Sequence, residues 1–157
     1  YQPEVKNLET GKNQRITGIR AQKYLVDWPQ IGSPRNNMVF IRFPDILLMK
    51  AEAILRGGTP TAAGVYGNTA RDIVNTLRTH PSRDASSLSA VSLDILLDER
   101  GRELWWEGWR RQDMIRFGKY LQPFQEKDYP SDPKYLLFPI PAEQLSVNPN
   151  LKQNTGY

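Results

Sequence analysis

The sequence contains no cysteine and only one histidine, His80, among its 157 residues. The absence of cysteine excludes disulfides, thiolate metal sites and a cysteine nucleophile within these residues. A single histidine supplies too few nitrogen ligands for a typical transition-metal site. No serine lies in a nucleophile-elbow pattern that would pair with it in a catalytic triad. We therefore expect no metal, no cofactor and no histidine-based catalysis.

Long apolar runs are also missing, so the sequence predicts no transmembrane helix. The first residue is Tyr1 and no signal segment is visible, which indicates a processed chain or a portion of a longer one. The net charge is +4, but the 21 basic residues are interleaved with 17 acidic ones. Because nucleic-acid-binding proteins usually concentrate their basic residues on one face, this pattern predicts no nucleic-acid partner.

Tryptophan, by contrast, is concentrated in residues 98–116, DERGRELWWEGWRRQDMIR. On a helix that turns roughly 100° per residue, the leucines at 93, 97 and 104 form one stripe and Trp106 falls almost opposite Leu97. Glu107-Gly108 is typical of a helix end. We predict a break or kink there, with a further helix restarting at Trp109 and reaching Tyr120.

The four tryptophans receive two interpretations. Aromatic residues at helical spacing usually fill a core, so we expect Trp105 and Trp106 to pack between helices. Trp109 lies near the predicted corner, and Trp28 lies beside a loop rich in proline and glycine. Because an indole face suits the apolar face of a sugar ring, Trp28 and Trp109 are the candidate ligand-binding residues.

The chain divides by composition into four regions. Residues 1–41 are polar and irregular, with a possible strand at residues 19–28. Residues 42–81 predict a helical pair: one helix starts at Arg42 and ends at Gly57-Gly58, and a second runs from about Thr69 to His80. Residues 92–120 predict a second pair, with Ser92 as its N-cap. Residues 121–157 form an extended tail, where prolines hold residues 135–141 out of helix.

These elements predict a mainly α-helical fold built from tetratricopeptide-like pairs, each near the size of the ~34-residue repeat, with irregular loops. No active site is visible in this pattern. Glu99 and Glu103 lie one helical turn apart and resemble the carboxylate pair of a glycoside hydrolase. Four arginines surround them, which favours structural ion pairs: Arg100, Arg102, Arg110 and Arg116. We therefore predict a binding protein and no enzyme. Two alternatives stay open, a tetratricopeptide-type peptide-binding module and, less favoured, a hydrolase using Glu99 and Glu103.

Three ordered blocks resemble one family. The first is IRFPDILLMKAEA at residues 41–53, and the second is the tryptophan-rich stretch at residues 98–116. The third, in residues 139–157, contains PIP, NPNL and QNTGY. Gly101 and Thr155 depart from the family pattern without disturbing its order. On these blocks the chain resembles the SusD/RagB family.

The resemblance implies the C-terminal part of a SusD-like domain, a tetratricopeptide-like α/α superhelix. It also implies a cell-surface lipoprotein of the outer membrane that captures oligosaccharides or other nutrients for polysaccharide utilisation. The partner would be a SusC-like TonB-dependent transporter. The lipid anchor of the family would lie outside this chain. No family binding residue matches a position here, so the resemblance implies no site residues.

Overall fold

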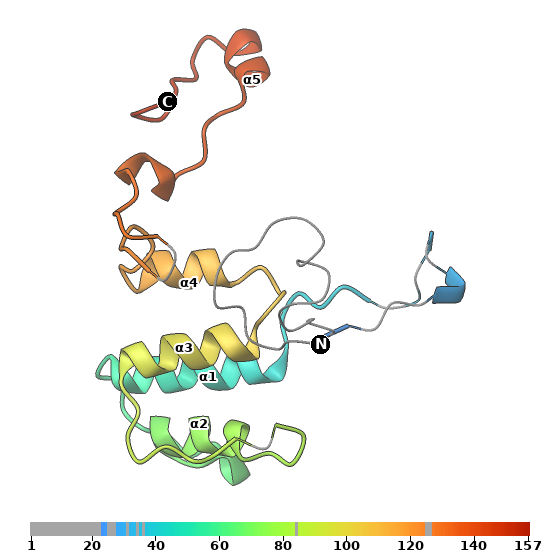
Figure 1. The fold of residues 1–157 in the computed structure, drawn as a ribbon, viewed down its shortest axis with the longest axis vertical. Coiled ribbons are helices and arrows are strands. Elements are labelled where there is room, and N and C mark those ends of the chain that lie inside the picture. The colour runs from blue at the N-terminus through green and yellow to red at the C-terminus, as the bar shows by residue number, and fades with distance from the viewer. Residues whose placement is uncertain are drawn as a thin grey trace. The chain divides into compact units, whose positions relative to one another are not determined.

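The computed structural model describes residues 23–24, 28–30, 32–33, 35, 37–83, 85–124 and 127–157 (Figure 1). The chain forms two compact units, Tyr1–Met38 and Val39–Tyr157. In the first unit, the strand predicted at residues 19–28 lies mostly outside the described residues. Its last residue, Trp28, instead begins the short 3-10 helix η2 (Trp28–Gln30).

The second unit is built from α-helices. In chain order they are α1 (Phe43–Leu55), α2 (Ala70–Arg78), α3 (Leu93–Glu103), α4 (Arg110–Arg116) and α5 (Ala142–Val147). Two 3-10 helices, η3 (Gly64–Tyr66) and η4 (Pro133–Leu136), lie among them. Within the described residues, strand-type pairing is limited to an isolated bridge between Phe124 and Lys127. The prediction of a mainly helical fold is confirmed.

The core lies where α1 packs against both α2 and α3 (Figure 1). Its buried side chains recur three or four positions apart, the spacing that lines one face of a helix. They are Leu47, Leu48, Ala51, Ala70, Ile73, Val74 and Leu96. Two of them are alanines, whose small side chains let α1 and α2 approach closely. Three helices therefore share one apolar centre.

Local sequence signals set the helix starts. Pro44 occupies the first turn of α1, where its missing amide proton costs no hydrogen bond. The Thr69 hydroxyl accepts a hydrogen bond from the Asp72 amide at 3.1 Å, and the Asp72 carboxylate accepts one from the Thr69 amide at 3.1 Å. This reciprocal pair is a capping box. Ser92, the predicted N-cap of α3, accepts a hydrogen bond from the Ile95 amide at 3.3 Å, which confirms that prediction.

The corner between α3 and α4 differs from the prediction. We expected a helix as far as Gly108 and a second one reaching Tyr120, but α3 ends at Glu103 and α4 ends at Arg116. Residues 104–108, named here the tryptophan turn, connect the two helices. Trp106, with φ of 66°, and Gly108, with φ of 80°, both have left-handed backbone, which a right-handed helix cannot continue. The predicted break exists, but it begins four residues early.

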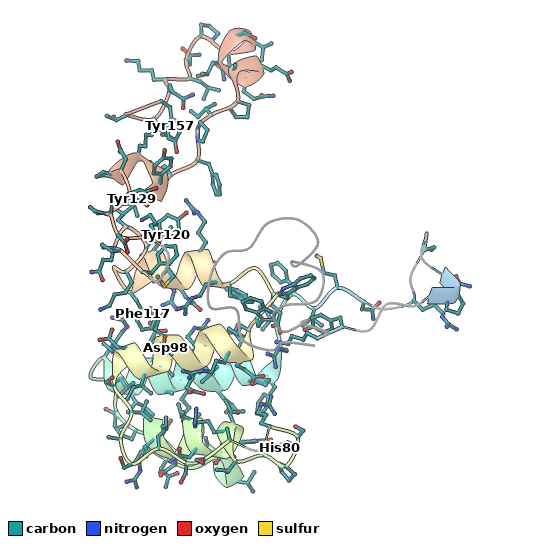
Figure 2. The ribbon with its side chains drawn as sticks, viewed as in Figure 1. His80, Asp98, Phe117, Tyr120, Tyr129 and Tyr157 are labelled. Atoms are coloured by element: carbon teal, nitrogen blue, oxygen red, sulfur yellow. The ribbon has the colours of Figure 1, made fainter. Side chains whose placement is uncertain are left out.

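The C-terminal tail, residues 121–157, is only partly extended. Tyr135 and Leu136, predicted to be extended, lie in η4, and α5 follows the two prolines. The Gln153 amide group accepts a hydrogen bond from the Ile140 amide and donates one to the Ile140 carbonyl, both at 2.9 Å. The Tyr157 hydroxyl donates to the Leu137 carbonyl at 3.0 Å (Tyr157 is labelled in Figure 2). We call Gln153 and Tyr157 the polar clasp, because they fold the end of the tail onto its earlier part.

Candidate functional site

The first carboxylate of the hydrolase hypothesis, Glu99, is buried on α3 and held by two arginines. Its Oε1 atom accepts hydrogen bonds from Arg78 of α2 and from Arg102, one turn further along α3. Arg78 also donates to the Ser86 carbonyl at 2.8 Å, so its position is fixed from two sides. A carboxylate engaged in this way holds α2 against α3.

The second carboxylate, Glu103, is held by arginines as well. Arg83 donates to both of its oxygens, at 2.8 and 2.7 Å, and Arg42 donates to Oε1. Burial acts to raise the pKa of Glu103, but the hydrogen bonds from Arg83 and Arg42 outweigh burial and hold the pKa below its ordinary value. A general acid of a glycosidase needs a raised pKa. Glu103 is therefore suited to ion pairing and not to proton donation.

A second set of ion pairs lies inside the helical core. Arg100, 1% exposed, places its guanidinium 2.9 Å from Asp45 of α1 and 2.8 Å from Asp113 of α4. The contact with Asp45 is an ion pair without hydrogen-bond geometry, whereas Arg100 Nε donates a directed hydrogen bond to Asp113. Arg116 donates to both oxygens of Glu52 at 2.7 and 3.0 Å and to Asp113 at 2.8 Å. These charges join α1, α3 and α4, so the predicted structural ion pairs exist, but Arg100 and Arg116 pair with Asp45, Glu52 and Asp113 and not with Glu99 or Glu103.

A cleft of about 240 Å³ lies between α2 and α3. It combines an apolar part with charged groups of both signs, and its lining residues include Leu48, Leu77, Arg78, Arg83, Glu99 and Arg102. A second hollow of about 220 Å³ lies beside α3 and α4 and is lined in part by Asp94, Asp98, Arg110, Lys119 and Gln122 (Asp98 is labelled in Figure 2). Both can hydrogen-bond a polar ligand, but the carboxylates of the first are already held by arginines.

Trp105 and Trp106 do not pack between helices as predicted. Their side chains are 55% and 75% exposed, because the tryptophan turn leaves the helical path before it reaches them. Trp109 directly precedes α4 and is half-buried. Trp28 lies in the first compact unit, and its side chain is outside the described residues. The two predicted ligand-binding tryptophans, Trp28 and Trp109, thus belong to different compact units, and their role in binding stays a prediction.

Arg42, at the start of the first motif block, is a further residue of the site, and no local sequence pattern predicts its contacts. Its Nε atom donates to both carboxylate oxygens of Glu107, at 2.8 and 2.9 Å, and another of its nitrogens donates to the Glu103 carbonyl. Arg42 thus ties the start of α1 to both ends of the tryptophan turn. The sequence signal for this contact is the opposite charge of Arg42 and Glu107, which belong to two different motif blocks and lie 65 positions apart.

His80 is exposed just after α2, and its Nδ1 atom lies 2.7 Å from the Ser82 hydroxyl (His80 is labelled in Figure 2). Across the described part of the chain, no group of three or more histidine, cysteine, aspartate or glutamate residues has the arrangement of a metal site. None of the helices described is both long and apolar enough to cross a bilayer.

Comparison with known proteins adds three related sequences. A starch-binding protein, SusD of Bacteroides thetaiotaomicron, is 28% identical over 94% of this chain. Two SusD-like proteins of Formosa agariphila are each 32% identical, over 82% and 77% of the chain. The chain spans only 25–27% of the length of these relatives.

Among solved structures, surface glycan-binding protein A from Bacteroides thetaiotaomicron matches 78% of this chain with a TM-score of 0.62 and 27% sequence identity. The match covers 26% of that protein. A family model described as the SusD family matches residues 2–136. That span includes residues 1–41 almost entirely, although the three motif blocks begin only at residue 41. On the extent of this match, the chain belongs to the SusD family.

Proposed function

We propose that this chain is part of a cell-surface protein that captures oligosaccharides and delivers them to a partner TonB-dependent transporter in the outer membrane. The observation that carries the proposal is membership of the SusD family over residues 2–136. Two similar proteins support it by their names, one a starch-binding protein and the other a surface glycan-binding protein. The membrane attachment would be a lipid anchor outside this chain.

We further propose that residues 42–81 and 92–120 are two tetratricopeptide-like helical pairs of an α/α superhelix, with residues 1–41 as an irregular region before them. The packing of α1 on α2 and the contact of α3 with α4 support this division. Residues 121–157 would then be the C-terminal tail of the SusD-like domain. Trp28 and Trp109 remain proposed ligand-binding residues.

A non-catalytic role agrees with the chemistry of the site. The SusD family consists of glycan-binding proteins without catalytic activity. Glu99 and Glu103, which the hydrolase alternative requires, each accept hydrogen bonds from two arginines. The tetratricopeptide-type alternative requires a groove of available basic side chains. In the cleft between α2 and α3, Arg78 and Arg83 are already paired with these carboxylates, which favours the glycan proposal.

The proposal can be tested directly in cells that make this protein. Deletion of its gene is expected to reduce the binding of at least one fluorescent polysaccharide to intact cells, and re-expression is expected to restore it. A TonB-dependent transporter is expected to co-purify with the protein from detergent-solubilised outer membranes. Unchanged binding of every polysaccharide in the deletion strain would refute glycan capture, and peptides would then be tested on the same strains.

A further inference from the structure

We propose that the tryptophan turn, residues 104–108, is a sugar-stacking platform on which the indole faces of Trp105 and Trp106 bind the rings of a neutral glycan. This inference rests on the proposed function and assigns a site to it. It differs from the sequence prediction, which expected these two residues to lie in the core and chose Trp28 and Trp109 for the ligand.

The exposure of the two rings is the first observation. Trp105 is 55% exposed and Trp106 is 75% exposed, although tryptophan contributes a large apolar surface wherever it is buried. Trp106 also has φ of 66°, a left-handed backbone conformation that a bulky side chain rarely adopts. Such strain persists where the surrounding structure imposes it, and it gathers at ligand sites. Here the strained backbone presents a ring outward.

The second observation is that the turn is held rigidly from both ends. Arg42 donates to the Glu103 carbonyl before the turn and to both carboxylate oxygens of Glu107 within it, at 2.8 and 2.9 Å. The Glu107 side chain is only 3% exposed, so this pair is shielded from water. The Glu107 amide donates to the Leu104 carbonyl at 3.1 Å. The backbone that carries the two rings is therefore fixed before a ligand arrives, which lowers the entropy cost of binding.

The chemistry around the rings favours a sugar as the occupant. A pyranose ring presents C–H bonds on its faces, whose slight positive charge complements the negative face of an indole. It also presents hydroxyl groups, which need hydrogen-bonding partners at the edge of the platform. The arginines on either side of the turn are already bound, Arg102 to Glu99 and Arg110 to the Leu97 carbonyl at 2.7 Å, so the hydroxyl groups of a stacked sugar would keep water as their partner. Two exposed indole rings, in a chain similar to a starch-binding protein and to a surface glycan-binding protein, suit a carbohydrate.

Trp106→Gly is the decisive variant, because glycine accepts the left-handed backbone at this position and the fold should persist. We expect its affinity for the glycan that binds the wild-type protein to fall at least about tenfold, the scale of losing one aromatic stacking contact. Trp105→Ala should also weaken binding, and Trp106→Phe should restore part of it by replacing a ring. Phe138→Ala is the matched control, because Phe138 is an exposed aromatic residue (70%) outside the turn, and its affinity should not change.

The measurements are isothermal titration of the purified protein and polysaccharide binding by intact cells carrying each variant on the chromosome. If Trp106→Gly cells bind the polysaccharide as well as wild-type cells do, while the deletion strain loses binding, the proposed platform is refuted but glycan capture by the protein is not. No loss in the deletion strain would instead refute the function itself. Acrylamide quenching of tryptophan emission gives an independent check. If the Trp106 signal, taken as wild type minus Trp106→Gly, is shielded without ligand, another part of the protein covers the turn and the platform is refuted.

Discussion

The three-helix core and the C-terminal tail are ordered by different interactions, although both belong to the same compact unit. In the core, α1, α2 and α3 bury leucine, isoleucine, valine and alanine side chains around shared ion pairs. None of the described residues of the tail, 121–124 and 127–157, is buried. There the polar clasp supplies hydrogen bonds at the surface. Because water competes with exposed hydrogen bonds, the tail depends on a few polar atoms and the core on collective packing.

The largest effect should come from removing the central charge of the core. Arg100 is 1% exposed and contacts both Asp45 and Asp113. Arg100→Met leaves the buried Asp45 without its cation and Asp113 with Arg116 alone, so we expect the free energy of unfolding to fall by about 3–5 kcal/mol. Urea denaturation followed by circular dichroism measures the loss.

Arg102→Met is the matched control for that variant. The Arg102 side chain is 62% exposed and pairs with Glu99 at the surface end of α3. Exposed ion pairs contribute little, so the expected loss is below about 1 kcal/mol. Equal losses in the two variants would show that burial of the charge does not distinguish them.

A pair of leucine truncations compares the core and the tail directly. Leu96 is 0% exposed in α3, whereas Leu137 is 58% exposed in the tail. Leu96→Ala creates a cavity and should lower the free energy of unfolding by about 2–5 kcal/mol. Leu137→Ala should change it by less than about 0.5 kcal/mol. A large loss at Leu137 would mean that the tail packs against something that shields it, and the contrast between the regions would fail.

Acid should weaken the core and spare the clasp. Burial acts to raise the pKa of Glu52, but hydrogen bonds from Arg116 and Arg56 outweigh it and hold the pKa below its ordinary value of 4.5. The unfolded chain therefore binds this proton at a higher pH than the folded chain does. The stabilisation is complete above the ordinary value and is lost as the pH falls through the lowered one.

Urea titrations from about pH 7 down to about pH 3 measure that dependence. Glu52→Gln is expected to make the fall in stability less steep, because one of the groups that binds a proton on unfolding is gone. The Gln153 side chain does not titrate, so the amide protection factor of Ile140 should stay constant until the core itself unfolds. A fall in that protection at a pH where the core is intact would contradict the separation of the two regions.

The smallest global effect is expected at the clasp. Gln153→Ala removes the two hydrogen bonds to Ile140, yet it should change the free energy of unfolding by less than about 1 kcal/mol. Locally, hydrogen exchange at the Ile140 amide should accelerate about fivefold, the factor that corresponds to about 1 kcal/mol. Lys152→Ala, at the exposed neighbouring position, is the control and should leave the exchange rate unchanged.

Sequence signals predicted the parts of the fold that depend on neighbouring residues. Ser92 as an N-cap, Thr69 at the start of a helix and Gly57-Gly58 after α1 are all read within one or two helical turns. The end of α3 was predicted wrongly, and the Glu103 carbonyl at that end accepts a hydrogen bond from Arg42, 61 positions away. The periodicity of residues within one helix cannot predict a contact over that separation. For the same reason the exposure of Trp105 and Trp106 was missed, since a helical wheel assumes that the helix continues.

The hydrogen-bond geometry of Arg116 limits which substitutions the chain can tolerate. Its two terminal nitrogens bind two oxygens of Glu52 and one of Asp113 at the same time, a pattern that requires a planar fork of donors. A lysine at position 116 would keep the charge and lose that fork. Lys119 makes a single contact of 3.0 Å with Asp94, which either cation satisfies. Random mutagenesis should therefore accept exchange between lysine and arginine at position 119 and reject it at position 116.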